Sequence, residues 1–299
     1  MLFGVDLGGT KIEAAVIDPA RITEPLLRRR VDTPSREGYE AIVEAIASLV
    51  DDCARELGVP TPAVVGIGTP GTTEPDTGLL KNSNTTCLNG RPLRDDLAAR
   101  LGCEVRPAND ANCFALAEAT LGAGRGKDVV FGVILGTGIG GGVVVNRQVL
   151  GGRHGIGGEW GHTVMDPQGV PCYCGHTGCL ETLIAGPSLE NFYESLTGVR
   201  KRMRDIGEED SEAARATVDR LVNWFGRAIG GVINLLDPDA VILGGGMGQI
   251  PGLPERFRRA ALPWVFNPEI RTEFLVPELG DSAGVFGAAM LGSMAAPSS

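Results

Sequence analysis

The sequence has few aromatic residues and no run of basic residues that offsets its acidic charge, and both shortages limit what the protein can do. Aromatic residues make up 5 % of the 299 residues, and the formal net charge is −10. A groove for nucleic acid needs a basic face, which this charge balance does not offer. ATP remains an acceptable ligand, because backbone amides and one or two cations are enough to bind its phosphates locally. We therefore expect no nucleic-acid partner.

Targeting segments and membrane spans are also missing from the sequence. The residues after Met1 contain neither a basic n-region nor a small-residue cleavage site. Residues 129–146 are uncharged, but six of them are glycine, which is typical of a strand, a glycine turn and a second strand. The seven cysteines are an odd number and do not suggest a secreted disulfide framework. We expect a cytoplasmic protein with no membrane partner.

Glycine, in contrast, is abundant, with 44 residues, and the chain is long enough for two domains. Strands alternate with amphipathic helices, which is typical of an α/β fold. Residues 3–8 recur as residues 131–136, with five of six positions identical. This repeat predicts two related α/β domains, whereas a chance match of two apolar glycine turns is the alternative.

The domains are expected at 1–117 and 118–281, joined by a hinge, with a closing helix in residues 282–299 packing back on the first domain. One helix is expected to open at Thr33-Pro34, since proline is tolerated in a first helical turn. The closing helix is expected over Ala283–Met294.

Glycine turns at the strand ends are candidate phosphate sites. The first, at Asp6–Lys11, offers small residues, a hydroxyl and a cation, and Asp6 is suited to hold Mg²⁺ through water. It is neither a Walker A loop nor a Rossmann fingerprint, and a plain tight hairpin is the alternative. The turn at Gly136–Gly142 favours phosphate binding, because two turns from related domains can face each other across a cleft. A third, Gly244–Gly246, offers a floor for a nucleobase, unless it only lets a helix cross a strand. The candidate ATP-binding residues are Asp6, Gly8, Gly9, Thr10, Lys11, Gly136, Thr137, Gly138, Gly140, Gly244, Gly245 and Gly246.

Asp110 is the candidate catalytic base. It follows Asn109 at the start of an expected helix over 111–121, where the helix N-terminus favours an ionised carboxylate. An ordinary aspartate, with a pKa of ~3.9, is too weak to deprotonate an alcohol beforehand. In a loose phosphoryl-transfer transition state it needs only to position the hydroxyl and accept its proton late. The spacing alone also fits two residues that merely cap the helix.

A cluster of cysteines predicts a metal site. Cys172, Cys174 and Cys179 together with His162 supply three thiolates and one imidazole, a set typical of structural Zn²⁺. Three free thiols in a loop are the alternative. His176 lies inside the cluster, and the spacing alone does not decide between it and His162.

Taken together, these motifs stand in the order found in the ROK family (repressors, open reading frames, kinases), which the sequence resembles over essentially its whole length. The motifs that carry the resemblance are Asp6–Lys11, Asn109–Asn112, Gly136–Gly142, Glu159–His162, Cys172–Cys179 and Gly280–Gly284. The resemblance implies an actin-like, Hsp70-like ATPase fold with two α/β domains around a cleft. It also implies ATP-dependent phosphorylation of a hexose on its 6-hydroxyl, a homodimer, and His162 as the fourth zinc ligand. The sugar pocket that it implies is lined by Asn84, Asn109, Asp110, Glu159, His162 and Glu181.

The choice of hexose depends on loop segments. Lys81–Gly90 and Val170–Gly175 are similar to the corresponding segments of the fructokinase branch, although Met165–Gln168 is shorter than the matching loop of either branch. The resemblance therefore predicts fructose, with N-acetylglucosamine or glucose as the alternative. ROK repressors carry an N-terminal helix-turn-helix, for which we expect no room here. A sugar-responsive binding protein that has lost its chemistry is the non-enzyme alternative, and the intact candidate catalytic residues argue against it.

Overall fold

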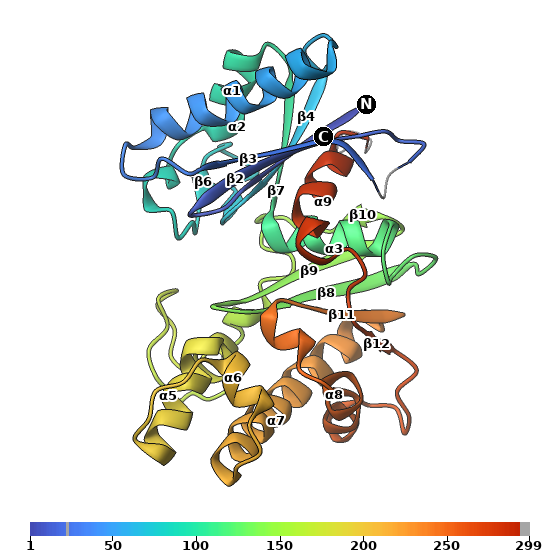
Figure 1. The fold of residues 1–299 in the computed structure, drawn as a ribbon. Helices are drawn as coiled ribbons and strands as arrows, with labels where there is room; N and C mark the ends of the chain where they lie inside the picture. Colours follow the sequence, from blue (N-terminus) through green and yellow to red (C-terminus); the bar gives the residue numbers. More distant parts are fainter. Residues whose placement is uncertain (22–23, 294–299) are drawn as a thin grey trace. The chain divides into compact units, whose positions relative to one another are not determined.

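The computed structural model describes residues 1–21 and 24–293 and divides into two compact units (Figure 1). Unit 1 comprises Met1–Gly122, Gln148–Gly157 and the residues from Leu279 onward. Unit 2 comprises Ala123–Arg147 and Gly158–Glu278. Each unit is described by itself below.

The elements of unit 1 begin and end close to where the apolar pattern changes. Its strands are β1 (Leu2–Leu7), β2 (Lys11–Ile17), β3 (Pro25–Asp32), β4 (Val64–Thr69), β5 (Thr72–Thr73), β6 (Leu80–Lys81), β7 (Glu104–Asn109) and β10 (Gln148–Val149). Its helices are α1 (Tyr39–Leu57), α2 (Leu93–Leu101), α3 (Asp110–Thr120) and α9 (Ala283–Leu291), with short 3₁₀ turns at Thr86–Leu88 and Gly280–Ser282.

The elements of unit 2 are mainly helical after its first hairpin. Its strands are β8 (Val129–Leu135), β9 (Ile139–Val145), β11 (Ala240–Gly244) and β12 (Glu273–Leu275). Its helices are α4 (Leu180–Ile184), α5 (Gly186–Thr197), α6 (Met203–Glu208), α7 (Glu212–Leu236) and α8 (Leu253–Ala261), with short 3₁₀ turns at Trp160–His162, Gly246–Gln249 and Leu262–Trp264.

The two main sheets share a strand order, since β2-β1-β4-β7 in unit 1, with β3 beside β2, matches β9-β8-β11-β12 in unit 2. In each sheet a central strand pairs antiparallel with the next strand of the chain and parallel with a later one. The sequence repeat therefore corresponds to the β1-β2 and β8-β9 hairpins, and the expected fold class of two related α/β units is confirmed.

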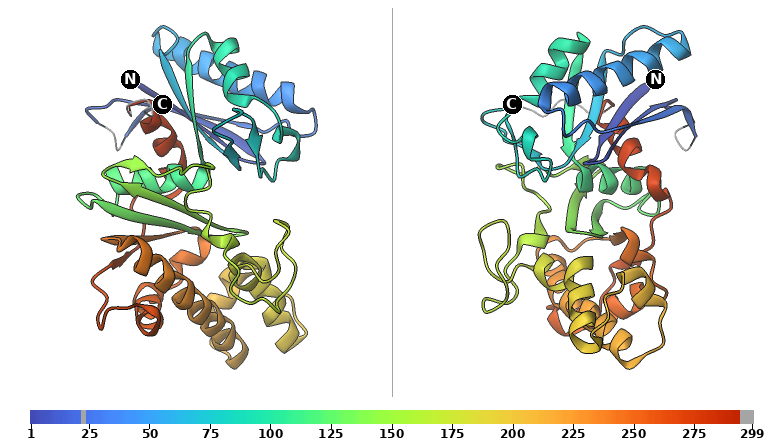
Figure 2. Two further views of the ribbon diagram at one scale, coloured as in Figure 1. Left: turned by 180° about the vertical axis from the view of Figure 1, so that it is seen from behind. Right: turned by 60° about the vertical axis from the view of Figure 1, so that its left-hand side comes forward.

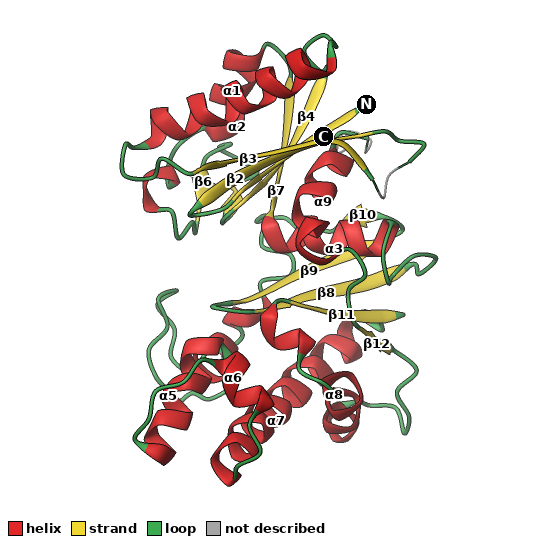
Figure 3. Ribbon diagram, viewed as in Figure 1, coloured by secondary structure: helices red, strands yellow, loops and turns green. Residues whose placement is uncertain are grey.

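The sheet of unit 1 is covered by helices on both faces (Figures 1 and 3). Phe3, Val5 and Leu7 of β1 share one hydrophobic core with Ile42 of α1, because alternate residues of a strand point to the same face. On the opposite face, α9 lies so close that a Cβ atom on Gly4 would collide with the helix backbone. This close approach explains why a glycine stands in the middle of β1.

Unit 2 is built around a line of aromatic side chains. Phe131 of β8 contacts Trp160 edge to face, with ring centroids 5.4 Å apart, and Trp160 meets Phe225 of α7 in the same way at 5.5 Å. Phe225 in turn stacks on Phe257 of α8 at 3.8 Å. The long helix α7, seen from behind in Figure 2, thereby joins the sheet to α8 through the core.

Two expected helix boundaries differ from the structure. α1 begins at Tyr39 rather than at Thr33-Pro34, because the Thr33 side chain donates a hydrogen bond to the Gly8 carbonyl of the first glycine turn instead of capping a helix. α9 ends at Leu291, and Met294 lies outside the described residues. Among the residues that the structure describes, no helix is both long and apolar enough to cross a bilayer.

Candidate active site

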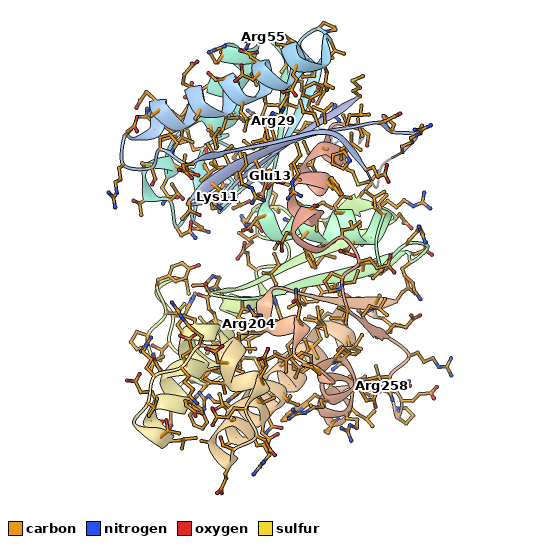
Figure 4. The ribbon with its side chains drawn as sticks, viewed as in Figure 1. Lys11, Glu13, Arg29, Arg55, Arg204 and Arg258 are labelled. Carbon is orange, nitrogen blue, oxygen red and sulfur yellow. The ribbon has the colours of Figure 1, made fainter. Side chains whose placement is uncertain are left out.

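The first glycine turn joins β1 to β2 in unit 1. Hydrogen bonds that its carbonyl groups accept hold it in shape. The amide of Gly8 donates to the Lys11 carbonyl at 2.9 Å. The Thr33 hydroxyl donates to the Gly8 carbonyl at 2.8 Å, and the Thr33 amide donates to the Thr10 carbonyl at 2.9 Å. Within the described part of the chain, the amides of Gly9 and Thr10 have no acceptor, so these N–H groups are available to an anion. Figure 4 labels Lys11, which begins β2 at this turn.

Asp6 stands near the end of β1, directly before the first turn. Burial, together with the nearby carboxylates of Asp110 and Glu13, raises the pKa of Asp6 to about 6, while Arg30 acts in the opposite direction. A Cβ atom on Gly284, near the start of α9, would lie 2.9 Å from the Asp6 carboxylate. The missing side chain at Gly284 therefore gives this carboxylate its space.

An ion-pair network lies beside Asp6 on the same sheet. Glu13 is opposite Asp6 on β1 and opposite Arg30 on β3, and its carboxylate pairs with both Arg28 and Arg30. Arg28 also donates to the Ser282 hydroxyl at 2.9 Å, just before α9 begins. Figure 4 labels Glu13 on β2. The sequence analysis missed this network, although the three consecutive arginines at 28–30 are a visible signal of it.

Asp110 begins α3; the residue is accessible to solvent, yet enough protein surrounds its carboxylate to desolvate it. Asn109 caps the helix, since its side-chain oxygen accepts from the Ala111 amide at 2.9 Å, and the Asp110 carboxylate accepts from the same amide at 2.7 Å. Asn109 also donates to the Gly71 carbonyl at 3.2 Å. Burial raises the pKa of Asp110, although hydrogen bonds from Ala111 and Asn109 lower it in part. This direction is opposite to the one expected from the helix N-terminus, because desolvation outweighs it.

The loop that carries Asn84 lies beside the first turn. Asn84 is exposed, and its loop is braced by Asn89, which accepts from the Ser83 amide at 2.8 Å and donates to the Ser83 carbonyl at 2.9 Å. A Cβ atom on Gly9 would lie 3.6 Å from the Thr85 hydroxyl. The structure thus brings Asn84, the first turn, Asp6 and the Asn109-Asp110 pair together in unit 1.

The second glycine turn joins β8 to β9 in unit 2. The amide of Gly136 donates to the Gly138 carbonyl at 3.0 Å. The amide of Ile139 donates to the Glu181 carboxylate at 2.8 Å. For Thr137 and Gly138, no acceptor of their amides is present among the described residues. The middle of this turn therefore offers N–H groups to an anion, as the first turn does.

The third glycine turn follows β11 and lies against the end of β8. Gly245 has a φ of 79°, and a Cβ atom there would collide with the Leu135 carbonyl. At Gly246 a Cβ atom would meet nothing within 4 Å. Backbone packing explains Gly245, whereas Gly246 leaves an open surface.

The segment Glu159–His162 is fixed to β9 by its two middle residues, Trp160 and Gly161. Trp160 is buried, and its indole N–H donates to the Gly140 carbonyl at 3.1 Å. Gly161 lies so close to β9 that a Cβ atom would collide with its backbone. Glu159 and His162 are therefore carried on a short turn that the core and β9 hold in place.

The predicted metal-ligating side chains come together. One ligand atom each from His162, Cys172, Cys174 and Cys179 lies within 4.8 Å of all the others. Cys172 Sγ is 3.6 Å from His162 Nδ1, and Cys174 Sγ is 3.5 Å from Cys179 Sγ. His176 Nδ1 lies 3.5 Å from Cys174 Sγ but is outside the set of four. The geometry therefore favours His162 as the fourth donor.

The chemistry of this cluster fits a divalent cation. Burial raises the pKa of Cys179 to about 12, with Cys174 and Cys172 adding to the shift. At Cys174, burial acts in the same direction, but hydrogen bonds with His176 and the other two thiols lower the pKa to about 6. Three thiols at this distance cannot all ionise without a compensating cation, which Zn²⁺ supplies.

The imidazole of His162 is oriented from its other side. Its Nε2 lies 3.0 Å from the Tyr173 hydroxyl while its Nδ1 faces the thiols. Metal-bound histidines usually have such a partner on the second ring nitrogen. Both ring nitrogens of His162 thus have partners within unit 2, and Tyr173 is a residue that the sequence analysis did not single out.

Comparisons with known proteins match the chain over nearly its whole length. The model of the ROK family matches residues 2–294. An N-acetyl-D-glucosamine kinase of Pectobacterium atrosepticum is 38 % identical over 308 residues, which cover 97 % of this chain and 98 % of the relative. A ROK hexokinase from Thermus thermophilus is 34 % identical, with a TM-score of 0.87 and coverage of 98 % of this chain and 97 % of the other. A ROK family glucokinase from Streptomyces griseus, solved with glucose and AMPPNP, is 31 % identical, with a TM-score of 0.80 and coverage of 98 % and 99 %.

Proposed function

The chain belongs to the ROK family and is a sugar kinase with the actin-like ATPase fold, and from this premise we propose that it transfers the γ-phosphoryl group of ATP to the 6-hydroxyl of a hexose. The observation that carries the proposal is in unit 1. Two carboxylates whose pKa values are raised by desolvation, Asp6 and Asp110, lie beside a glycine turn whose middle amides are available to an anion.

Asp110 is the proposed base. Its burial raises its pKa, which makes it a better proton acceptor at neutral pH than an ordinary aspartate. Its hydrogen bond from the Ala111 amide fixes the carboxylate, so that one oxygen can receive the proton of the sugar hydroxyl as the new P–O bond forms.

The glycine turns are the proposed binding sites of ATP. The amides of Gly9, Thr10, Thr137 and Gly138 suit phosphate oxygens, and Lys11 adds a positive charge. Mg²⁺, when bound, neutralises phosphate charge, and Asp6 would hold it. A dication fits here, because it offsets the repulsion between the carboxylates of Asp6 and its neighbours that raises the Asp6 pKa. The open backbone at Gly246 is the proposed floor for the nucleobase.

The sugar pocket is proposed to use amide and carboxylate side chains. Amides and carboxylates bind sugar hydroxyls in pairs, and a sugar that lacks one hydroxyl leaves a buried polar group unpaired, at a cost of ~1–3 kcal/mol. The proposed sugar-binding residues are Asn84, Asn109, Asp110, Glu159, His162 and Glu181. We also propose that His162, Cys172, Cys174 and Cys179 hold a structural Zn²⁺, which would fix the loop that follows Glu159. For His162 the two roles compete, and the metal is favoured, because its Nδ1 faces the thiols.

N-acetyl-D-glucosamine is the first candidate sugar. Relatives that bear the name N-acetyl-D-glucosamine kinase are 36–38 % identical over 97 % of this chain, and this whole-length likeness supports the choice over fructose. Fructose, which the sequence analysis predicts, is the second candidate, because the loop at Lys81–Gly90 is similar to that of the fructokinase branch. The homodimer and the cytoplasmic location stay predictions.

A coupled ADP-release assay with a panel of hexoses tests the proposal. We expect MgATP turnover that requires a hexose, with the highest kcat/KM for N-acetyl-D-glucosamine. Discrimination of roughly 5- to 150-fold follows from pocket differences of 1–3 kcal/mol. A higher kcat/KM for fructose would reverse the order of the two sugars. Sugar binding without ADP release would favour the non-enzyme alternative instead.

A further inference from the structure

One oxygen of the Glu181 carboxylate already accepts a hydrogen bond from the second glycine turn, so sugar binding is not its only candidate role. Glu181 Oε2 accepts from the Ile139 amide at 2.8 Å. A Cβ atom on Gly138 would lie 2.7 Å from the same oxygen. The missing side chain at Gly138 is what lets the carboxylate approach the turn.

The same short segment also carries a proposed zinc ligand. Cys179 precedes Glu181 by two residues, and the thiol of Cys179 donates to the His162 carbonyl at 3.4 Å. At the far end of the segment, the amide of Gly186 donates to the Gly136 carbonyl at 2.8 Å. Residues 179–186 therefore run from the cysteine cluster to both sides of the second turn.

We propose that Glu181 is a positioning residue for the nucleotide, which fixes the second turn and links it to the metal cluster through Cys179. The inference rests on the proposed function, since it takes a nucleoside phosphate as the ligand of that turn. The turn amides bind phosphate best when the backbone is held in shape beforehand, and the Glu181–Ile139 hydrogen bond provides that restraint. A Glu181 that only binds sugar has no influence on nucleotide affinity in the absence of sugar.

The test is the affinity for MgADP without sugar, measured by calorimetry. Glu181→Ala is expected to weaken binding about tenfold, in the range of one hydrogen bond to a charged group. Glu181→Gln keeps an oxygen that can accept from Ile139 and is expected to stay within about threefold of the wild type. Unchanged or tighter binding by Glu181→Ala contradicts the proposal, and tighter binding would mean that the carboxylate occupies the phosphate site itself.

Glu190→Ala is the matched control. Glu190 is a buried carboxylate of unit 2 that accepts from the Met203 amide at 3.1 Å, so its loss removes the same kind of contact away from the turn. It is expected to lower the melting temperature while leaving MgADP affinity unchanged. If Glu190→Ala loses as much MgADP affinity as Glu181→Ala does, general destabilisation explains the effect at Glu181, and the proposal is overturned.

The link to the metal cluster has its own test. Cys174→Ser is expected to weaken MgADP binding severalfold in the wild-type background but to add little in Glu181→Ala, because coupled residues are not additive. Full additivity contradicts the link. The outcomes also separate the two proposals. Wild-type protein that phosphorylates no hexose rejects the proposed function, whereas wild-type protein with hexose kinase activity, together with unaltered MgADP affinity in Glu181→Ala, rejects this inference alone.

Discussion

The two glycine turns begin from the same sequence, yet their surroundings differ in charge. Asp6 in β1 corresponds to Ile134 in β8 at the offset of the repeat. Asp6 is paired across the strands with Glu13, whereas Ile134 is paired with Gly140. The two carboxylates with raised pKa values, Asp6 and Asp110, therefore lie in unit 1. The carboxylate at the turn of unit 2 is Glu181, which comes from a later segment of the chain and accepts from the turn.

The turns also differ in what holds them. Thr33 donates to two carbonyl groups of the first turn, while Glu181 accepts from an amide of the second. The Thr33 groups that hold the first turn are uncharged, so the charged side chains at this turn are those of Asp6 and Lys11. The group that holds the second turn, Glu181, is itself a carboxylate, and it lies two residues after Cys179 of the cysteine cluster. The affinity of the first turn for phosphate should therefore respond to changes at its own residues, and that of the second turn to changes at the cysteine cluster.

The largest expected effect is on the chemistry of unit 1. Asp110→Asn keeps the shape and the hydrogen bond from Ala111 but removes the proton acceptor. We expect kcat to fall at least ~100-fold while sugar and MgADP still bind, as judged by ADP release and calorimetry. Near-normal turnover would remove Asp110 from the mechanism.

A second prediction concerns the pH dependence of stability in unit 1. Asp6 has a pKa of about 6 in the folded chain, against 3.8 as its ordinary value, so the folded state holds this proton more tightly than the unfolded state does. Stability is therefore lost as the pH rises from about 4 to about 6. Asp6→Asn should raise the free energy of unfolding by about 1–3 kcal/mol at pH 8 and much less at pH 4, in denaturant titrations without Mg²⁺.

The control for this prediction is Asp52→Asn, which changes an exposed carboxylate on α1. It should leave the pH dependence as it is in the wild type. The Asp6 interpretation is wrong if Asp6→Asn is no more stable than the wild type at pH 8.

The third prediction concerns the Zn²⁺ proposed for unit 2. Purified protein should contain about one Zn²⁺ per chain, and Cys174→Ser should lose it. Sugar affinity is expected to fall about tenfold and more than MgADP affinity, because the metal fixes the loop after Glu159. Metal analysis and calorimetry provide the measurement. Protein purified without chelators that contains no zinc would contradict the prediction, and loss of zinc from His176→Ala but not from His162→Ala would reassign the fourth ligand.

The smallest expected effect is that of removing the Thr33 hydroxyl, which holds the first turn. Thr33→Val keeps the amide that donates to Thr10 but removes the hydroxyl that donates to Gly8. One neutral hydrogen bond contributes ~0.5–1.5 kcal/mol, so MgADP affinity should fall about three- to fivefold. An equal loss in the background of Cys174→Ser is also expected, because Thr33 does not act through the metal loop. Unchanged affinity would mean that the turn keeps its shape without this hydroxyl.

Local patterns were sufficient to predict the hairpins and the cluster of cysteines with His162. The repeat of residues 3–8 predicted the β1-β2 and β8-β9 hairpins, because strand, glycine turn and strand are all encoded within a few residues. The cysteine spacing predicted the cluster for the same reason, since three of its four donors lie within eight residues.

Long-range contacts were beyond prediction. The expected start of α1 at Thr33 was wrong, because the hydroxyl of Thr33 is used by a turn 25 residues away along the chain. The bond between Glu181 and Ile139 spans 42 residues, and no local signal marks it. The pKa direction at Asp110 was missed because burial depends on how α3 packs in the folded unit.

The central proposal is that the amides of the glycine turns bind nucleotide phosphate while the acid–base chemistry belongs to unit 1. A crystal structure with a nonhydrolysable ATP analogue and the preferred hexose tests this most directly. The account predicts phosphate oxygens within ~3.2 Å of a turn amide, at Gly9 or Thr10 or at Thr137 or Gly138, and the 6-hydroxyl within the same distance of the Asp110 carboxylate. Phosphates that contact neither turn, or a 6-hydroxyl that faces another carboxylate, would contradict it.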